Sequence, residues 1–144
     1  MNDNLLTVLV VEDDDLVLRT MVALLERENY RVHVARTGAE GLMVAARVDP
    51  DVVLLDLMMP ELNGFQFLRK IRQSVQKELP VVVVSARTDP VNAYWARRLG
   101  ADDFVHKPFT ARQLVGAIEA QRERMSERGE DSTPQPDPMQ DTAT

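Results

Sequence analysis

The sequence predicts an α/β protein in which five parallel strands form one sheet and five helices cover both of its faces. Two features of the chain support this fold. Aliphatic segments alternate with helical patterns, which is typical of strand–helix–strand units with a parallel sheet. Several of these segments are apolar without interruption, as expected for strands that are buried on both faces. A chain of 144 residues is long enough for one such domain.

The predicted strands are residues 5–11, 30–35, 52–55, 81–85 and a short segment that starts at Phe104. Residues 52–55 are aliphatic throughout and lead into Asp56, and residues 81–85 repeat this design and end at Ser85. Residues 30–35 alternate between apolar and polar side chains. This alternation indicates a strand at an edge of the sheet, with one face less buried.

The predicted helices occupy residues 16–28, 37 to just before Asp49, a segment after Asn63-Gly64, about 90–99, and 110 to about 124. Apolar residues recur there every three to four positions, as on the buried face of a helix. Residues 37–40 and 110–113 match the capping box that begins many helices. Gly100 suits the position that ends the fourth helix. We expect Trp95 in this helix to pack into the core.

Composition excludes several classes of protein. The chain has no cysteine and therefore no disulfide, thiolate metal site or cysteine nucleophile. No apolar segment approaches the ~20 residues needed to span a bilayer, and the N-terminus lacks the basic start of a secretory signal. We therefore expect a cytoplasmic protein. The net charge is −6, of which −4 lies from Ser126 onward. An acidic body argues against direct binding to nucleic acid or anionic lipid.

The character of the chain changes near its C-terminus. From Ser126 onward apolar periodicity is lost, and prolines and acids are frequent. We expect residues 1–124 to form the domain and residues 125–144 to form a disordered, acidic, Pro-containing tail.

Polar side chains stand where four of the predicted strands end. Glu12 and Asp13 follow the first strand, Asp56 follows the third, Ser85 ends the fourth and Lys107 follows the fifth. Right-handed crossovers bring the carboxyl ends of parallel strands to one rim of the sheet, which is where such sheets bind ligands. We therefore expect these side chains to converge.

This set of side chains predicts phosphoryl transfer. Two carboxylates about 4 Å apart repel by roughly 4 kcal/mol at an effective dielectric constant near 20, so three of them need a compensating cation. Lys107 supplies one positive charge, and oxygen ligands without His or Cys suit Mg²⁺. A carboxylate such as Asp56 can attack phosphorus and become an acyl phosphate. Metal and lysine would neutralise the phosphoryl oxygens.

The segments that carry these residues resemble the receiver domain of two-component response regulators, in particular stand-alone regulators of the chemotaxis type. The resemblance covers about residues 5–124 and rests on residues 10–13, 54–60 with Asn63-Gly64, 84–86, 100–104 and 107–109. Each segment is weak evidence alone, but their order and their places at the strand ends make the set specific. The resemblance implies the flavodoxin-like receiver fold.

The resemblance also implies roles for the acids. Asp56 would accept the phosphoryl group from a histidine kinase or a phosphotransfer protein. Asp13 would bind Mg²⁺ directly, Glu12 would assist, and the backbone carbonyl of Met58 would complete the protein ligands together with Asp56. Asp14 and Asp15 are interpreted as acids of the helix start.

Three further residues receive roles in the same way. Ser85 would bind a phosphoryl oxygen, Lys107 would pair with the phosphoryl group, and Phe104 would turn inward as Ser85 moves. The family often has Thr in place of Ser85 and Tyr in place of Phe104, and both differences leave the site intact. The bond between Lys107 and Pro108 is often cis in the family.

Phosphorylation would alter the surface of the fourth helix, fifth strand and fifth helix, where a protein target would bind. Candidate residues on it are Ala93, Tyr94, Arg97, Val105 and Arg112. The protein would be a monomer or a phosphorylation-dependent dimer. It would be a signalling domain rather than an enzyme, apart from catalysing its own phosphorylation and slow hydrolysis of the aspartyl phosphate.

Three other interpretations remain open from the sequence. The chain could be a receiver-like module that docks partners without phosphorylation, or a fragment of a larger DNA-binding or enzymatic regulator whose linker is the acidic tail. A metal-dependent phosphatase would use the same acids, but no substrate pocket is recognisable in the sequence.

Overall fold

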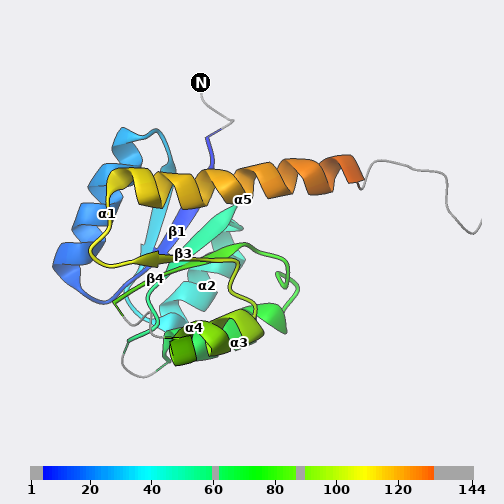
Figure 1. Cartoon of the computed structure of the whole chain (residues 1–144), viewed down its shortest axis with the longest axis horizontal. Helices are drawn as coiled ribbons and strands as arrows, with labels where there is room; N and C mark the ends of the chain where they lie inside the picture. Colours follow the sequence, from blue (N-terminus) through cyan, green and yellow to red (C-terminus); the bar gives the residue numbers. More distant parts are fainter. Residues whose placement is uncertain (1–4, 60–61, 87–89, 132–144) are drawn as a thin grey trace, which may run out of the picture.

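The structure, a computed structural model, describes residues 5–59, 62–86 and 90–131. Five strands and five helices alternate along these residues (Figure 1). The strands are β1 (Thr7–Val11), β2 (Arg31–Ala35), β3 (Val52–Leu55), β4 (Val81–Ser85) and β5 (Asp103–His106). The helices are α1 (Asp15–Arg27), α2 (Gly38–Val48), α3 (Gly64–Arg72), α4 (Pro90–Arg98) and α5 (Ala111–Asp131).

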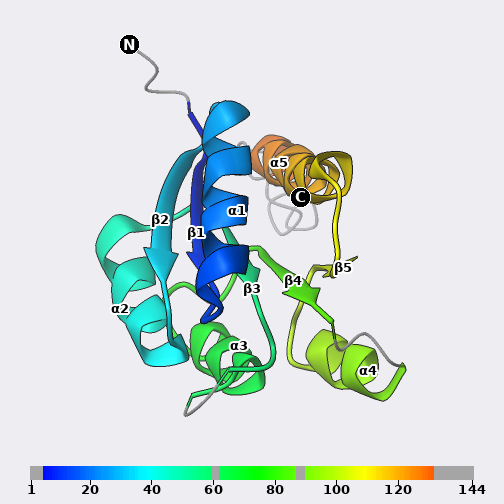
Figure 2. The ribbon, with the colours of Figure 1, turned by 90° about the vertical axis from the view of Figure 1, so that its left-hand side faces the viewer.

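The strands form one parallel sheet in the order β2-β1-β3-β4-β5 (Figure 2), which confirms the predicted α/β fold. The strand of residues 30–35, expected at an edge, is indeed the edge strand β2. The order is the flavodoxin-like one, in which the chain reverses its direction of winding between β1 and β3. The carboxyl ends of β1 and β3 therefore flank the position where ligands bind to such sheets.

Buried aliphatic side chains fill both faces of the sheet. Within β1, Leu9 and Val11 contact the layer of α2, α3 and α4, whereas Val8 and Val10 contact the layer of α1 and α5. The strand residues alternate between faces because successive side chains of a strand point in opposite directions. Figure 1 shows α5 on one side of the sheet and α3 and α4 on the other.

Local signals in the sequence begin the helices as expected. Asp14 caps α1 by accepting a hydrogen bond from the N–H of Val17 at 3.0 Å. Residues 63–66 and 110–113 each form a reciprocal capping box. Thr37 caps α2 by accepting from the N–H of Glu40, but the Glu40 carboxylate accepts from Arg36 instead of from Thr37. The caps satisfy N–H groups that have no partner within the helix.

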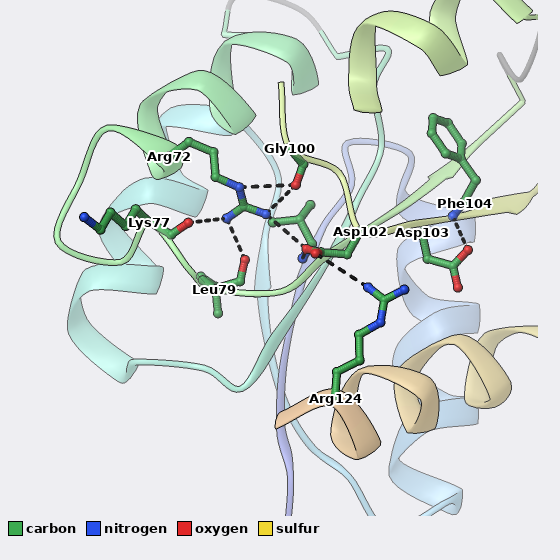
Figure 3. Close-up of polar contacts among 9 residues, drawn as sticks. Arg72, Lys77, Leu79, Gly100, Asp102, Asp103, Phe104 and Arg124 are labelled. Atoms are coloured by element: carbon green, nitrogen blue, oxygen red, sulfur yellow. Dashed lines mark hydrogen bonds and ion pairs between the residues drawn. The ribbon is translucent and has the colours of Figure 1, made fainter. Parts of the chain in front are cut away.

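Arg72, the last residue of α3, joins three segments that are distant in sequence (Figure 3). Its guanidinium donates to the carbonyl oxygens of Lys77 at 3.1 Å, Leu79 at 2.7 Å and Gly100 at 2.5 Å. It also pairs with the Asp102 carboxylate at 3.0 Å. Gly100 has φ +103°, a conformation that suits glycine after a helix, and a Cβ there would lie 2.5 Å from Nε of Arg72.

Two expectations about the region of α4 and β5 are wrong. Trp95 is 52% exposed, because α4 buries only Ala96 fully and residues 94 and 95 lie on its outer side. Val105, expected on the target-binding surface, is 5% exposed. It points from β5 into the layer of α1 and α5, on the face of the sheet opposite to Phe104.

The predicted end of the last helix near Arg124 is also wrong, since α5 continues to Asp131. Met125 still packs against the apolar layer of α1 and α5, and Arg122 pairs with Glu119 at 3.2 Å on the helix surface. Arg and Glu are good helix formers, and adding residues to an existing helix costs little, so the loss of apolar periodicity did not end the helix. In Figure 1 the orange end of α5 extends beyond the sheet. Residues 132–144 of the expected tail lie outside the described residues.

Candidate functional site

The predicted site residues converge at the carboxyl ends of four adjacent strands. Glu12 follows β1, Asp56 follows β3, Ser85 ends β4 and Lys107 follows β5. They line one open pocket of about 570 Å³, together with Asp13, Asp14, Val17, Met58 and Ala86. The backbone of the sheet holds two of the acids in place, since Glu12 N–H donates to Ala35 at 3.0 Å and Asp56 N–H donates to Val11 at 3.0 Å. The acids therefore lie on a rigid frame.

Three carboxylates form the centre of the pocket. One oxygen from each of Glu12, Asp13 and Asp56 lies within 4.8 Å of the others. Glu12 is 2% exposed and Asp56 is 6% exposed, whereas Asp13 is open to solvent. Two of the three carboxylates are therefore buried against the end of the sheet, and solvent reaches the group on the side of Asp13.

Lys107 brings a positive charge to this group, and its amine lies closer to Glu12 than to Asp56. Its Nζ lies 2.6 Å from Oε1 of Glu12 and 3.7 Å from Oδ1 of Asp56. Asp56 also accepts a hydrogen bond from the N–H of Met58 at 3.2 Å. Among the described residues, one ammonium group faces three carboxylates, so these side chains together carry an excess of negative charge.

Burial makes the ionised forms of Glu12 and Asp56 still less favourable. Loss of solvent raises the pKa of the Asp56 carboxyl, although the charge of Lys107 opposes the change. Burial likewise raises the pKa of the Glu12 carboxyl, against the hydrogen bond from Lys107. A raised carboxyl pKa means that the ionised form is poorly stabilised in the folded protein. A cation that binds among the three acids would relieve this cost.

The donor set fits a magnesium ion better than a softer metal. In the described part of the chain, the grouped ligand atoms are carboxylate oxygens, and Mg²⁺ prefers oxygen ligands. Met58 lines the pocket with a side chain that is 49% exposed. The role of its carbonyl as a ligand stays a prediction.

Ser85 and Phe104 lie at different depths. Ser85 is fully buried and lines the pocket, and its carbonyl accepts from the N–H of Lys107 at 3.1 Å. Phe104 is not among the residues that line the pocket. It pairs with Val83 in the sheet, and the Arg97 guanidinium of α4 lies 5.9 Å from its ring centre. The Lys107–Pro108 peptide bond is cis, in agreement with the family resemblance.

Comparisons with known proteins agree with this geometry. Residues 8–119 match the family model of the response regulator receiver domain. The chain belongs to this family. Receiver domains are signalling domains of two-component systems, and they are controlled by phosphorylation.

Two curated relatives of this receiver domain are longer proteins. Transcriptional regulatory protein AfsQ1 of Streptomyces coelicolor is 35% identical over 126 residues, which are 88% of this chain and 55% of AfsQ1. Transcriptional regulatory protein SrrA of Staphylococcus aureus is 34% identical over 113 residues, which are 78% of this chain and 46% of SrrA. The chain spans about half the length of the curated relatives that it matches.

Solved receiver structures match nearly over their whole length. A response regulator receiver domain protein of Clostridium thermocellum has a TM-score of 0.79 at 31% identity, covering 85% of this chain and 98% of that one. Chemotaxis protein CheY4 of Vibrio cholerae has a TM-score of 0.77 at 26% identity, covering 81% and 98%.

The remaining acids near the receiver site have structural contacts. Asp14 caps α1, and Asp15 pairs with Arg19 at 2.7 Å and with Arg36 at 2.8 Å. This confirms their interpretation as acids of the helix start. In the described part of the chain, no helix is long and apolar enough to cross a membrane.

Sequence reasoning missed an apolar pocket of about 470 Å³ beside the site. It is lined by Leu16, Val17, Thr20, Ala86, Lys107, Pro108 and Phe109. Leu16 is 73% exposed. Its position at the start of α1, outside the buried stripe of that helix, was the signal available in the sequence.

Proposed function

We propose that this receiver domain is a switch that accepts a phosphoryl group on Asp56 in a Mg²⁺-dependent reaction. The observation that carries the proposal is the convergence of Glu12, Asp13 and Asp56 around the amine of Lys107. In the reaction a carboxylate oxygen of Asp56 forms a bond to phosphorus while the phosphorus–nitrogen bond of a phosphohistidine breaks. The electron pair of the broken bond returns to the imidazole ring of the donor.

Glu12, Asp13, Asp56 and the carbonyl of Met58 would hold the Mg²⁺ ion. When bound, the ion supplies positive charge that offsets the acids and the incoming phosphoryl oxygens. The proposal draws support from the raised pKa values of the Glu12 and Asp56 carboxyls, which reflect burial without enough positive charge.

Lys107 and Ser85 would hold the phosphoryl group after transfer. Lys107 contacts Glu12 closely and Asp56 more distantly, so a small movement brings its amine to an oxygen on Asp56. Ser85 lines the same pocket and has a hydroxyl that can donate a hydrogen bond. Both groups would bind negative charge that is present only after phosphorylation.

Phosphorylation would then change the surface of α4, β5 and α5, where a protein target would bind. A phosphoryl group adds about −1.5 to −2 charges, which would draw the Ser85 hydroxyl toward Asp56. Phe104 would follow, since its strand pairs with β4 and its ring lies beside Arg97 of α4. Tyr94, Arg97 and Arg112 are exposed members of this surface.

The phosphodonor would be a histidine kinase or a phosphotransfer protein. A docking module that works without phosphorylation would not need buried carboxylates, a lysine and a hydroxyl in one pocket. The cost of burying these charges therefore favours the phosphoacceptor over the docking module.

The test is incubation of the protein with Mg²⁺ and acetyl phosphate, followed by intact-mass measurement. We expect one phosphoryl adduct on the unaltered protein and none on Asp56→Ala. The matched control is Asp14→Asn, because Asn caps a helix as well as Asp does while the charge at the rim is lost. This variant should still be phosphorylated.

Two results would reject the proposal. One is the absence of an adduct on the unaltered protein with Mg²⁺ present. The other is an equal adduct on Asp56→Ala, which would place the phosphoryl group elsewhere. Omission of Mg²⁺ with added chelator should also abolish the adduct.

A further inference from the structure

The outer side of the edge strand β2 carries backbone groups that the sheet does not use. Among the described strands β2 pairs with β1 alone, and it lies at one end of the sheet (Figure 2). The N–H of Arg31 and the carbonyl of Ala35 bond to the segment that contains β1, at 2.9 and 3.0 Å. Because the backbone groups of a strand alternate in direction, Val32 and Val34 turn their N–H and C=O groups outward.

The middle of β2 lacks the usual protection of an edge strand. Natural edges are shielded by charged side chains, prolines or bulges. Residues 32–34 are Val-His-Val, with no proline, acid or lysine among them. The register with β1 is regular over the whole strand, so β2 has no bulge, and Val34 is 41% exposed. This edge is therefore suited to pairing with a further strand.

A mainly apolar groove of about 400 Å³ lies beside this edge on the α1 face of the sheet. Apolar side chains of α1 and Val34 form its walls, and Arg19, Glu26 and Arg36 complete its lining. We call it the α1 groove. Val34 shares the side of β2 on which Val32 packs against the layer of α1 and α5. A further strand at this edge would place every second side chain over the α1 groove.

The two ends of the α1 groove differ in charge. Glu26 lies near the start of β2, because the last turn of α1 leads into this strand. Arg19 and Arg36 lie at the other end, where they pair with Asp15 at 2.7 and 2.8 Å. The side chains of Arg19, Arg36 and Asp15 together carry a net positive charge. The α1 groove is therefore complementary to a copy of itself that is turned end to end.

We propose that β2 pairs antiparallel with β2 of a second copy of this chain, so that one sheet continues through a dimer. In this register Val32 lies opposite Val34 of the second copy, and the two residues exchange both N–H···O bonds. His33 lies opposite His33 of the second copy, on the twofold axis. The valines form β-branched cross-strand pairs beside the α1 groove, and such pairs stabilise a sheet.

The twofold axis also brings unlike charges together, which favours a second copy over an unrelated strand. It places Glu26 beside Arg19 and Arg36 of the second copy, and the same contact repeats on the other side of the axis. Complementary charges of this kind fix register and partner choice. The contact is separate from the α4–β5–α5 surface of the proposed switch, because β5 lies at the opposite edge of the sheet.

Cysteine cross-linking tests the register at the twofold axis. The chain has no cysteine, so His33→Cys gives each copy a single thiol. Opposed residues that exchange no hydrogen bonds have Cα atoms about 4.5 Å apart, a distance that a disulfide spans. We expect oxidised glutathione to convert the full, unphosphorylated His33→Cys chain to a cross-linked dimer on a non-reducing gel. Val75→Cys is the control at a fully exposed position, and it should cross-link about tenfold more slowly or less.

Charge reversal tests the contact between the two grooves. Glu26→Arg and Arg19→Glu should each weaken self-association about tenfold, measured by sedimentation velocity on the unphosphorylated chain. An equal mixture of the two variants should associate again, because positions 19 and 26 then bring opposite charges together at both contacts. Glu127→Arg makes the same change at an exposed position of α5 and should leave self-association unchanged.

Recovery of association in the mixture would also show that both variants are folded. A chain that stays monomeric at its highest soluble concentration would overturn the proposal, as would equal cross-linking of the two cysteine variants. A dimer that forms equally well in Glu26→Arg, or a mixture that associates no better than its components, would place the contact elsewhere. None of these results depends on whether Asp56 accepts a phosphoryl group.

Discussion

Replacing Arg72 should destabilise the domain more than replacing any exposed arginine. Its guanidinium bonds to the carbonyl oxygens of Lys77, Leu79 and Gly100 and to the Asp102 carboxylate. It thereby links the end of α3, the segment before β4 and the turn between α4 and β5 (Figure 3). The side chain is only 20% exposed, so water can replace few of these contacts.

The expected loss follows from these contacts. Hydrogen bonds to charged groups contribute about 1.5–3 kcal/mol each, and the contributions of neighbouring bonds do not add fully. We expect Arg72→Ala to lower the free energy of unfolding by about 3 kcal/mol, since several acceptors lose their donor at once. Arg72→Lys should lower it by about 2 kcal/mol, because one ammonium group cannot reach both sides of the guanidinium fork.

Urea denaturation followed by circular dichroism would measure these losses, with an unchanged m value as the sign that the unfolding remains two-state. Arg124→Ala is the control, because Arg124 meets the same Asp102 carboxylate at 3.8 Å with a side chain that is 52% exposed. It should cost no more than about 0.5 kcal/mol. The reasoning is refuted if Arg72→Lys is as stable as the unaltered protein.

Three more predictions concern stability, each measured by the same denaturation. Gln121 is fully buried in α5, and its amide has no hydrogen-bond partner among the described residues. Gln121→Leu should therefore stabilise the domain by about 1–2 kcal/mol. A stability equal to or lower than that of the unaltered protein would contradict this. Gly116 is exposed within α5, and a Cβ there would meet no atom within 4 Å, so Gly116→Ala should add about 1 kcal/mol. A loss of stability would contradict this. Burial raises the pKa of Asp56 above its ordinary value of 3.8, so the folded state holds the proton more tightly than the unfolded state does and stability falls as the pH rises through this range. Asp56→Asn should therefore be the more stable protein at neutral pH in chelator, and the difference should shrink as the pH falls toward 3.8. A variant that is less stable at neutral pH would contradict the direction of the shift.

The positions of Glu12, Asp56 and Ser85 could be predicted because each of them ends or follows an aliphatic strand. Residues 52–55 are aliphatic throughout, which predicts a buried strand, and Asp56 then stands at its end. The same holds for Glu12 after β1 and for Ser85 at the end of β4. Right-handed crossovers place all of these ends at one rim, so their proximity required no knowledge of side-chain packing.

The predictions for Trp95, Val105 and the end of the last helix were wrong because these features depend on packing and helix propensity and not on the apolar pattern of the sequence. The exposure of Trp95 depends on how α4 is rotated against the sheet, and a short helix with small inward residues leaves that rotation undetermined. Val105 lies in a strand too short for its alternation to reveal which face is covered. The end of α5 depends on the propensity of charged residues, which carries no apolar period.

The site combines an unfavourable charge balance with a rigid frame, and this combination explains how it can respond to phosphorylation. A second cation beside Lys107 would lower the cost of burying Glu12 and Asp56, but it would also occupy the space in which a metal ion and a phosphoryl group are proposed to bind. The described residues place one ammonium group against three carboxylates, and like charges less than 5 Å apart repel by roughly 3–4 kcal/mol per pair at an effective dielectric constant near 20. Backbone hydrogen bonds to neighbouring strands hold the main chain of Glu12 and Asp56 in place. Binding of Mg²⁺ would relieve this repulsion, so Mg²⁺ should stabilise the folded, unphosphorylated domain. Asp13→Asn removes one of the three carboxylates, and the stabilisation by Mg²⁺ should disappear in this variant.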